Sequence, residues 1–345
     1  MKIRKLNTLR GIAALIVVVS HYSNETNFLN GILGHGGGQL GVMIFFILSG
    51  FLMSYLYMNK EFNITEVKQF AFARIARVVP LFLIIVLSSY LLISLDIKGI
   101  LYDIPNVAIL ISHLTFLSAT SLLWTIPAEI QFYIFFILLW WLLHKVAGHL
   151  YIIMAMLFIA IMYLKSPVQR GNVFGIPYEI VFISALPYFL MGVVYGQLYS
   201  RWRPPNYLTS GIFVLSILLI FLMYPNIFRS IFGLNHGMWR DIRVLLTVSL
   251  VFFLLVFLVP ENNIFLSNRI GDFLGNISYS LYLLHLPILL QFPKLDKDHP
   301  AIFLVIFLIT SISISYLSYL ILETPCRKAI RSVASRKTAI LTPPH

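Results

Sequence analysis

Charged side chains are scarce in this chain. Asp, Glu, Lys and Arg make up only 11% of its 345 residues, whereas an average soluble domain has about 25%. Hydrophobic residues reach 59%. A chain with this balance cannot cover a water-facing surface, which excludes an ordinary soluble protein and indicates an integral membrane protein. Apolar stretches of roughly 16 to 22 residues favour transmembrane helices over a barrel.

Acidic residues are scarcer than basic ones, 13 against 25, which gives a net charge of +12. In a soluble protein this excess would suggest nucleic acid as a partner. Here the basic residues lie near the ends of apolar stretches, where they set the orientation of the spans. We therefore expect no nucleic-acid partner.

Cysteine is nearly absent. The single Cys326 excludes an internal disulfide and a cysteine metal cluster, and we expect no metal. No small-x-small cleavage site precedes His21, so we expect the first apolar run to stay as a span instead of being removed as a signal peptide. No stretch between spans is long enough for a soluble domain. We predict a membrane domain over 1–330 and a basic cytoplasmic tail over 331–345.

Eleven stretches are apolar enough to be considered as spans: 8–23, 40–58, 79–95, 104–118, 124–144, 149–164, 180–199, 208–224, 241–259, 275–292 and 300–322. Segment 104–118 is short and contains Pro105 and His113. Treating it as re-entrant or interfacial leaves ten spans and puts most basic residues, including those of the tail, in the cytoplasm. We predict an all-α bundle of about ten transmembrane helices with cytoplasmic N- and C-termini.

The first span, LNTLRGIAALIVVVSHYS, carries Arg10 near one end and His21 near the other. Eleven positions on a helix return to nearly the same face, roughly 16 Å further along. Asn7 joins that face. Such a stripe could line a narrow passage for an extended ligand. The alternative is a snorkelling arginine and a hydrogen-bonded histidine at the interface.

Arg74 and Arg77, in FAFARIARVVP, are three positions apart and share one helical face. The pair suits a phosphate ligand, but an ordinary basic helix at the cytoplasmic interface has the same pattern. In GVMIFFILSGF, Ser49 and Gly50 are small enough to let another backbone approach closely, and such residues usually serve packing.

Three further ionisable residues stand at predicted span ends. Glu129 follows the start of its span, where a carboxylate also simply suits the positive end of a helix. The topology then sorts the candidates into an outer group, His21, Glu129 and His285, and an inner group, Arg10, Arg74, Arg77 and Glu323, in which Glu323 could pair with an arginine. The arrangement suggests a site through the membrane, with a phosphorylated donor inside and proton chemistry outside.

These segments, together with RIARVVP, LWTIPAEIQFY, GNISYSLYLLH and ETPCRK in the same order, resemble acyltransferase family 3, the membrane O-acyltransferases of bacterial surface glycans. The resemblance covers residues 6 to 330. It implies a ten-span enzyme of the bacterial inner membrane. The donor would be cytoplasmic acetyl-CoA or another acyl-CoA. The acceptor would be a hydroxyl of a sugar, glycolipid or polysaccharide at the outer face, such as lipopolysaccharide, and no residue selects among these.

The resemblance also implies roles at matching positions. Arg10 and His21 match the essential first-helix pair, Arg74 and Arg77 the paired arginines, and Glu129 the carboxylate. This chain departs from the family pattern at two places. Asn7 stands where Asp is frequent, so a charge pair with Arg10 is not expected, and Ile130 follows Glu129 where a second Glu is frequent.

The resulting hypothesis makes His21 the general base on the acceptor hydroxyl, since an imidazole titrates near neutral pH. Glu129 would orient His21 or bind the sugar. A covalent acyl-histidine intermediate uses the same residues. Two other classes stay open: a transporter or flippase of a glycan precursor, because intramembrane charges also mark substrate paths, and a structural component without chemistry.

Overall fold

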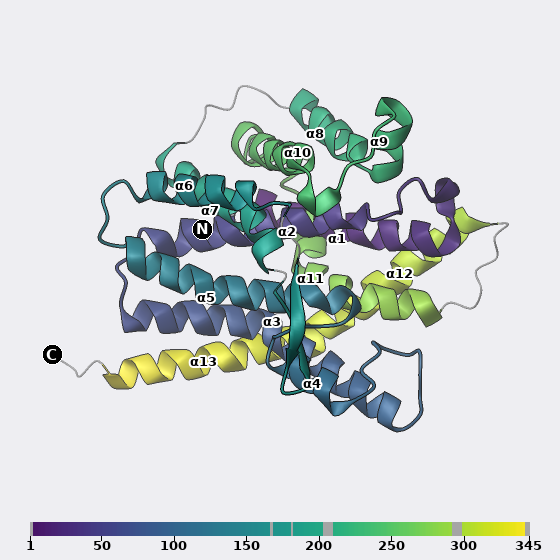
Figure 1. Cartoon of the computed structure of the whole chain (residues 1–345), viewed down its shortest axis with the longest axis horizontal. Helices are drawn as coiled ribbons and strands as arrows, with labels where there is room; N and C mark the ends of the chain where they lie inside the picture. The colour runs from purple at the N-terminus through teal and green to yellow at the C-terminus, as the bar shows by residue number, and fades with distance from the viewer. Residues whose placement is uncertain (1–2, 166–167, 181, 203–209, 292–298, 342–345) are drawn as a thin grey trace.

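The chain folds as a bundle of helices with one small hairpin (Figure 1). This computed structural model describes residues 3–165, 168–180, 182–202, 210–291 and 299–341, with side chains to residue 332. Its α-helices are α1 Arg4–Thr26, α2 Gly38–Met53, α3 Ile64–Ser94, α4 Val107–Leu114, α5 Thr125–Leu143, α6 His149–Met162, α7 Phe182–Arg201, α8 Ser210–Leu222, α9 Pro225–Phe232, α10 Ile242–Phe253, α11 Arg269–Gln291, α12 Pro300–Ser318 and α13 Thr324–Leu341.

Shorter elements complete the described fold. Strands β1 Gln169–Val173 and β2 Ile176–Ile180 pair antiparallel between α6 and α7. Three π-helical turns extend α2, α10 and α12: η2 Ser54–Met58, η5 Leu254–Leu258 and η6 Tyr319–Glu323. Three 3₁₀ turns lie in connections: η1 Phe28–Gly31, η3 Ser121–Trp124 and η4 Met238–Arg240.

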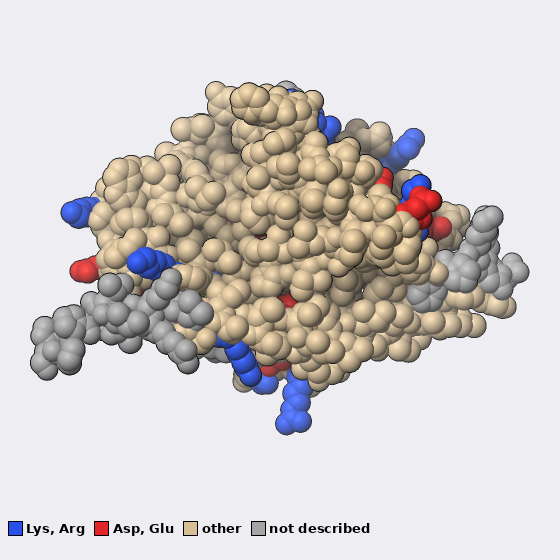
Figure 2. All heavy atoms as spheres, turned by 90° about the horizontal axis from the view of Figure 1, so that it is seen from below, with Lys and Arg blue, Asp and Glu red and all other residues tan. Residues whose placement is uncertain are grey.

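Several helices have the length and apolarity of membrane spans. Within the described residues six qualify: Gly38–Met58, Ile64–Ser94, Ser121–Leu143, Phe182–Arg201, Arg269–Gln291 and Pro300–Ser332. A seventh is added if α8 and α9, which meet at a bend of 87°, form one span. The face seen in Figure 2 carries few charged side chains over its broad central part. The protein is therefore an all-α, multi-pass membrane protein, as the composition predicts.

The remaining predicted spans are also helical, but they fall short of the length or the hydropathy of a membrane span. Helix α1 is 23 residues long, but its polar residues lower its hydropathy. Helix α6 and the run Ile242–Leu258 are apolar but shorter. Segment 104–118, which we expected to be re-entrant or interfacial, contains only α4, whose eight residues extend about 12 Å, less than half of a bilayer core of about 30 Å.

Small residues bring α1 and α11 together at the centre of the bundle. A Cβ atom at Gly11 would lie 2.7 Å from Cβ of Leu274, and one at Gly275 would overlap the carbonyl group of Asn7. On the other side of α1, a Cβ atom at Gly41 would overlap Ala13. Close backbone approach of this kind is a common packing mode between membrane helices, and it makes α1 the central element.

Helix α2 packs against α7 in the same way. A Cβ atom at Gly50 would overlap the carbonyl oxygen of Phe189, and one at Gly192 would overlap that of Ile47. The close approach predicted for Ser49 and Gly50 is confirmed. Gly50 makes this contact with α7, whereas Ser49, about 100° around α2, donates to Glu129 of α5.

The C-terminal segment continues as helix. α13 runs from Thr324 to Leu341, so the predicted tail over 331–345 begins inside a helix, and its residues 342–345 lie outside the described part of the chain. Figure 1 shows the end of α13 and the start of α1 toward the same end of the long axis.

Candidate active site

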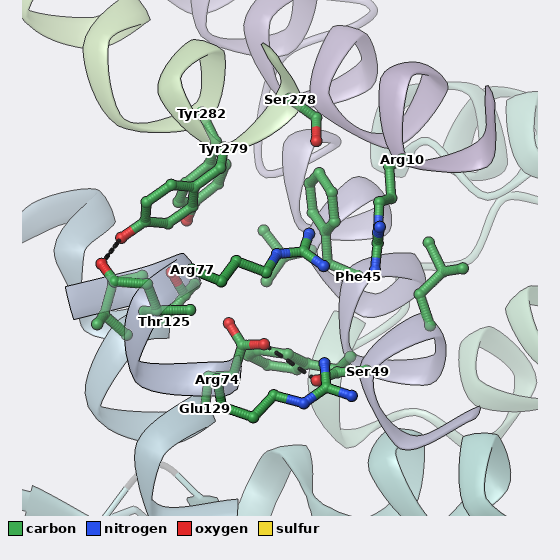
Figure 3. Close-up of a pocket in the computed structure, with 15 residues that line it drawn as sticks. Arg10, Phe45, Ser49, Arg74, Arg77, Thr125, Glu129, Ser278, Tyr279 and Tyr282 are labelled. Carbon is green, nitrogen blue, oxygen red and sulfur yellow. Dashed lines mark hydrogen bonds between the residues drawn. The ribbon is translucent and has the colours of Figure 1, made fainter. Parts of the chain in front are cut away.

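Five helices direct polar side chains into a narrow pocket inside the bundle (Figure 3). Its volume is about 60 Å³, room for no more than a few atoms of a ligand in this conformation. We call it the arginine pocket, and its polar lining residues are Arg10 from α1, Ser49 from α2, Arg74 and Arg77 from α3, Thr125 and Glu129 from α5, and Ser278, Tyr279 and Tyr282 from α11. Figure 3 shows the three guanidinium groups facing the same space as the Glu129 carboxylate.

Glu129 is held by two hydroxyl groups. Ser49 Oγ donates to its Oε1 at 3.0 Å, and the Tyr133 hydroxyl donates to the same oxygen at 2.5 Å. Tyr133 lies one helical turn after Glu129 on α5, so the two side chains share a face. Both donors serve the charged carboxylate, which gives Glu129 a fixed orientation toward the arginines.

Arg74 is buried without full hydrogen bonding. Its exposed fraction is 7%, and its Nε atom has no hydrogen-bond partner among the described residues. The guanidinium carbon lies 5.7 Å from the ring centre of Phe70 and 5.9 Å from that of Tyr133, within the range of cation–π contacts. An arginine inside a membrane protein with an unused donor favours a negatively charged partner.

Charge in the pocket is unbalanced. Arg10, Arg74 and Arg77 provide three positive charges, and Glu129 provides one negative charge. Arg10 is close enough to both other arginines for like-charge repulsion. Guanidinium groups gathered around one small space form a ready receptor for an anion, and Arg is the side chain that best matches phosphate geometry.

Helix α3 is what places Arg74 and Arg77 deep in the bundle. It is continuous from Ile64 to Ser94, and its N-terminus is capped by Asn63, whose side chain accepts from the Glu66 N–H at 2.9 Å. Beside Pro80, which interrupts its hydrogen-bond ladder, the Tyr279 hydroxyl of α11 donates to the Val78 carbonyl at 2.5 Å. The arginines therefore belong to the third span itself, whereas we expected them just before it.

His21 and His285 form a second polar cluster, where α1 and α11 meet. Nδ1 of His21 lies 3.3 Å from Nε2 of His285, and the ring centres are 5.2 Å apart. Each Nδ1 also faces a backbone carbonyl one turn earlier, that of Val17 at 2.9 Å and that of Leu281 at 3.0 Å. A carbonyl only accepts, so in the neutral rings both Nδ1 atoms carry the proton. His285 Nε2 can then share the His21 Nδ1 proton, and His21 Nε2 is left as a basic nitrogen.

Tyr282 connects the histidine pair with the arginine pocket. Its ring lines the pocket, and its centre lies 6.2 Å from that of His285. The hydroxyl donates to the Leu122 carbonyl at 3.1 Å, and Phe45 packs against the ring at 6.0 Å. Tyr282 is therefore the side chain that contacts both the arginine pocket and His285.

The structure changes one placement expected from the sequence, that of Glu129. Glu129 lies with the arginines and not with His21, because α5 directs it toward α2 and α3 while His21 faces α11. Glu323 accepts from Ser280 Oγ, and Arg327 and Arg77 lie close enough to attract its carboxylate. Asn7 donates to α11, to the Asp272 carbonyl at 2.9 Å and to Asn276 Oδ1 at 3.2 Å, so it faces the same helix as His21.

Three tyrosines of the site were not singled out from the sequence: Tyr133, Tyr279 and Tyr282. The signal was present in the helical spacing. Tyr133 is four residues after Glu129, and Tyr282 is three residues before His285.

Among the described residues no three His, Cys, Asp or Glu side chains are grouped to hold a metal ion.

A model of an acyltransferase domain matches residues 3–320, nearly the whole described membrane bundle. The chain belongs to the acyltransferase 3 family. No solved structure matches it.

Two curated relatives come from Staphylococcus aureus. The protein named "Putative O-acetyltransferase SACOL0978", of strain COL, is 26% identical over 355 residues, covering 94% of this chain and 57% of the relative. O-acetyltransferase OatA, of strain NCTC 8325 / PS 47, is 23% identical over 351 residues with the same two coverages. The chain therefore spans a little over half the length of the curated relatives it matches.

Proposed function

We propose that this protein is a membrane O-acetyltransferase. It moves an acetyl group from cytoplasmic acetyl-CoA to a hydroxyl of a surface polysaccharide or glycolipid at the outer face of the bacterial inner membrane. The observation that carries the proposal is an anion-attracting arginine pocket beside a histidine pair, with Arg10 and His21 on one continuous helix. The family and the names of the relatives support acyl transfer.

The donor's negative charges are the proposed partners of Arg74 and Arg77. Coenzyme A carries phosphates at one end and a thin pantetheine arm ending in the thioester at the other. The pocket, at about 60 Å³, is too small for a nucleotide and, in this conformation, for the whole arm, so donor binding must widen it. Phosphates held from the cytoplasmic side by the arginines would direct the thioester toward the histidines, about 16 Å further along α1.

His21 is the proposed general base. Its Nε2 atom takes the proton of the acceptor hydroxyl as the oxygen attacks the thioester carbonyl. The carbon–sulfur bond breaks, the sulfur leaves as a thiolate, and the proton held on Nε2 passes to it, giving coenzyme A and the acetyl ester. Base catalysis of this kind contributes about 10²–10⁴-fold. The Val17 carbonyl and His285 support the role because they keep the Nδ1 proton in place.

The mechanism needs the two substrates on opposite sides. We propose ten crossings with both termini in the cytoplasm, in which α1, α6 and the run Ile242–Leu258 cross together with the longer helices. The shared end of α1 and α13 in Figure 1 supports an even number of crossings. The start of α1 then faces the donor, and its His21 end faces the acceptor.

A transporter of an anionic glycan precursor is the second candidate, because three arginines lining one pocket also suit an anion path. Consumption of the thioester separates the two. Purified protein in detergent, given acetyl-CoA and envelope glycan, should release free coenzyme A and place acetate on the glycan. A transporter would release no coenzyme A.

A further inference from the structure

A second, larger cavity opens at the end of the molecule where α1 ends. Its volume is about 570 Å³, within the usual range of ligand pockets. Four connections surround it: the loop from α1 to α2, η3 before α5, the β1–β2 hairpin, and η4 before α10. We call it the outer cleft and define it by Gln39, Trp124, Arg170, Glu179, Trp239 and Arg240.

Two tryptophans form the apolar wall of the outer cleft. The rings of Trp124 and Trp239 meet edge to face with centres 5.6 Å apart, and both pack on Phe46, at 5.9 and 5.7 Å. Tyr188 supports Trp239 from a further side at 5.1 Å. Indole rings are broad and amphipathic, and a sugar ring presents a face of C–H groups that stacks on such a surface while its hydroxyls stay free.

Polar groups surround this wall. Oε1 of Gln39 is buried and has no hydrogen-bond partner among the described residues, so it is an acceptor prepared for an O–H or N–H donor. Arg170 and Glu179 pair across the hairpin at 2.7 Å, and the exposed Arg240 adds a further donor. Aromatic faces with a few fixed donors and acceptors suit a polyhydroxylated ligand better than an acyl chain or a nucleotide.

The loops around the outer cleft are held in one conformation. Asp241 begins α10 by accepting from the Arg243 N–H at 2.9 Å. The Arg243 guanidinium holds the pKa of the Asp241 carboxyl at about 2, so this cap stays charged at physiological pH. His35, Ser121 and Met238, which line the cleft, have positive φ angles of 48°, 49° and 45°. Strained backbone of this kind tends to gather at functional sites.

The outer cleft shares a wall with the arginine pocket. Phe46 lines the pocket, and its ring also contacts the two tryptophans of the cleft. Trp124 lines the cleft, and the next residue, Thr125, lines the pocket. Beside Gln39, the Gly38 N–H donates to Oγ of Ser20, which is next to His21. The outer cleft therefore borders the arginine pocket at Phe46 and Thr125, and its lining residue Gln39 directly follows Gly38, whose contact Ser20 precedes His21.

We propose that the outer cleft is the acceptor site and binds a sugar ring of the surface glycan, stacked on Trp239 and hydrogen-bonded by Gln39. This inference rests on the proposed function, because it assigns the second substrate of the same reaction. It places the acceptor hydroxyl at the end of the molecule opposite to the donor's entrance.

Acceptor kinetics in detergent test the proposal. Purified envelope glycan is varied at saturating labelled acetyl-CoA. Trp239→Ala and Gln39→Ala should each raise the KM for glycan about tenfold or more, with donor KM and the slow hydrolysis of acetyl-CoA without glycan unchanged. Trp239→Phe, which keeps an aromatic face, should fall between Ala and wild type. Trp141→Ala and Gln69→Ala, at exposed positions on α5 and α3, serve as matched controls and should match wild type.

The outcomes separate this inference from the proposed function. If the wild type transfers acetate but folded Trp239→Ala and Gln39→Ala keep its glycan KM, the acceptor binds elsewhere and the outer cleft is not the site. If Trp239→Ala, Gln39→Ala and Trp239→Phe all lose donor binding and acceptor binding to the same extent, the outer cleft has only a structural role. A wild type that transfers no acetate overturns the proposed function and this assignment with it.

Discussion

Arg74 is the residue whose surroundings argue most directly for an anionic ligand. It is almost fully buried, its Nε atom has no partner among the described residues, and two aromatic rings hold its guanidinium beside the pocket. A structural arginine at a membrane interface would instead reach water or lipid phosphate. The cost of keeping this charge inside is explained if the donor supplies the missing partner.

Removal of this charge should weaken donor binding. We expect Arg74→Ala to lower the affinity for a non-hydrolysable acetyl-CoA analogue by roughly 10- to 100-fold, since hydrogen bonds to charged groups are worth about 1.5–3 kcal/mol. Arg77→Ala should act in the same direction. Arg74→Lys should recover only part of the affinity because an ammonium cannot make the paired contacts of a guanidinium.

Titration calorimetry of the detergent-purified variants provides the measurement. Arg201→Ala, at an exposed site in the last turn of α7, is the control and should bind like wild type. Unchanged affinity in both Arg74→Ala and Arg77→Ala would make the two arginines ordinary orientation signals.

The sequence predicted that the three arginines lie together, and they do, but it grouped Glu129 with the histidines instead. Arg10, Ser49, Arg74, Arg77 and Glu129 all line one pocket. Glu129 was grouped with His21 because only its position along a span could be read, and the direction of a side chain depends on which helices pack around it. The tyrosines that hold Glu129 and line the pocket could have been found from their spacing of three or four residues.

At the scale of elements, close contacts at glycines set the geometry of the site. Helix α2 carries Ser49 and Gly50 as neighbours about 100° apart, so its contact with α7 at Gly50 sets how Ser49 meets Glu129. The sequence indicated this contact through its small residues. It could not indicate the 87° bend between α8 and α9 or the π-helical turns, because these depend on packing between distant segments.

A methyl group at Gly192 should separate α2 from α7. A Cβ atom there would overlap the Ile47 carbonyl oxygen, which belongs to rigid helix backbone, and overpacking of this kind costs about 1–3 kcal/mol. We expect Gly192→Ala to lower the Tm by several degrees and to reduce activity per folded molecule. Gly211→Ala is the matched control, since a Cβ atom there meets nothing within 4 Å, and alanine favours a helix. Thermal unfolding followed by tryptophan fluorescence measures both, and equal Tm values would show that the α2–α7 contact can relax.

At the scale of the whole molecule, the proposed reaction requires the donor end of the bundle and the acceptor end to face different compartments. Composition was sufficient to predict a helical membrane protein, and positive charges gave its proposed orientation. The number of crossings was harder to obtain, because α1 is too polar, α6 is short and α4 does not cross, so length and hydropathy alone separate them poorly.

Cysteine labelling should reveal the two ends. In a Cys326→Ser background, Gly175→Cys in the β-hairpin should react with a membrane-impermeant maleimide added to intact cells, or to cells with only the outer barrier opened. Lys145→Cys, in the connection from α5 to α6, should react only after the inner membrane is permeabilised. Both positions are exposed. The reverse pattern, or labelling of both from outside, would contradict the proposed orientation.

The central claim is that His21 takes the proton of the acceptor hydroxyl, and acetyl transfer by His21→Gln tests it most directly. Glutamine keeps a hydrogen-bonding side chain but cannot accept a proton at neutral pH. The account predicts a folded protein that binds donor normally and transfers acetate about 10²–10⁴-fold more slowly per molecule. His144→Gln is the control, because that ring also faces a backbone carbonyl, at 2.6 Å, but near the other end of the bundle. If His21→Gln transfers acetate within a few-fold of wild type, His21 is not the base.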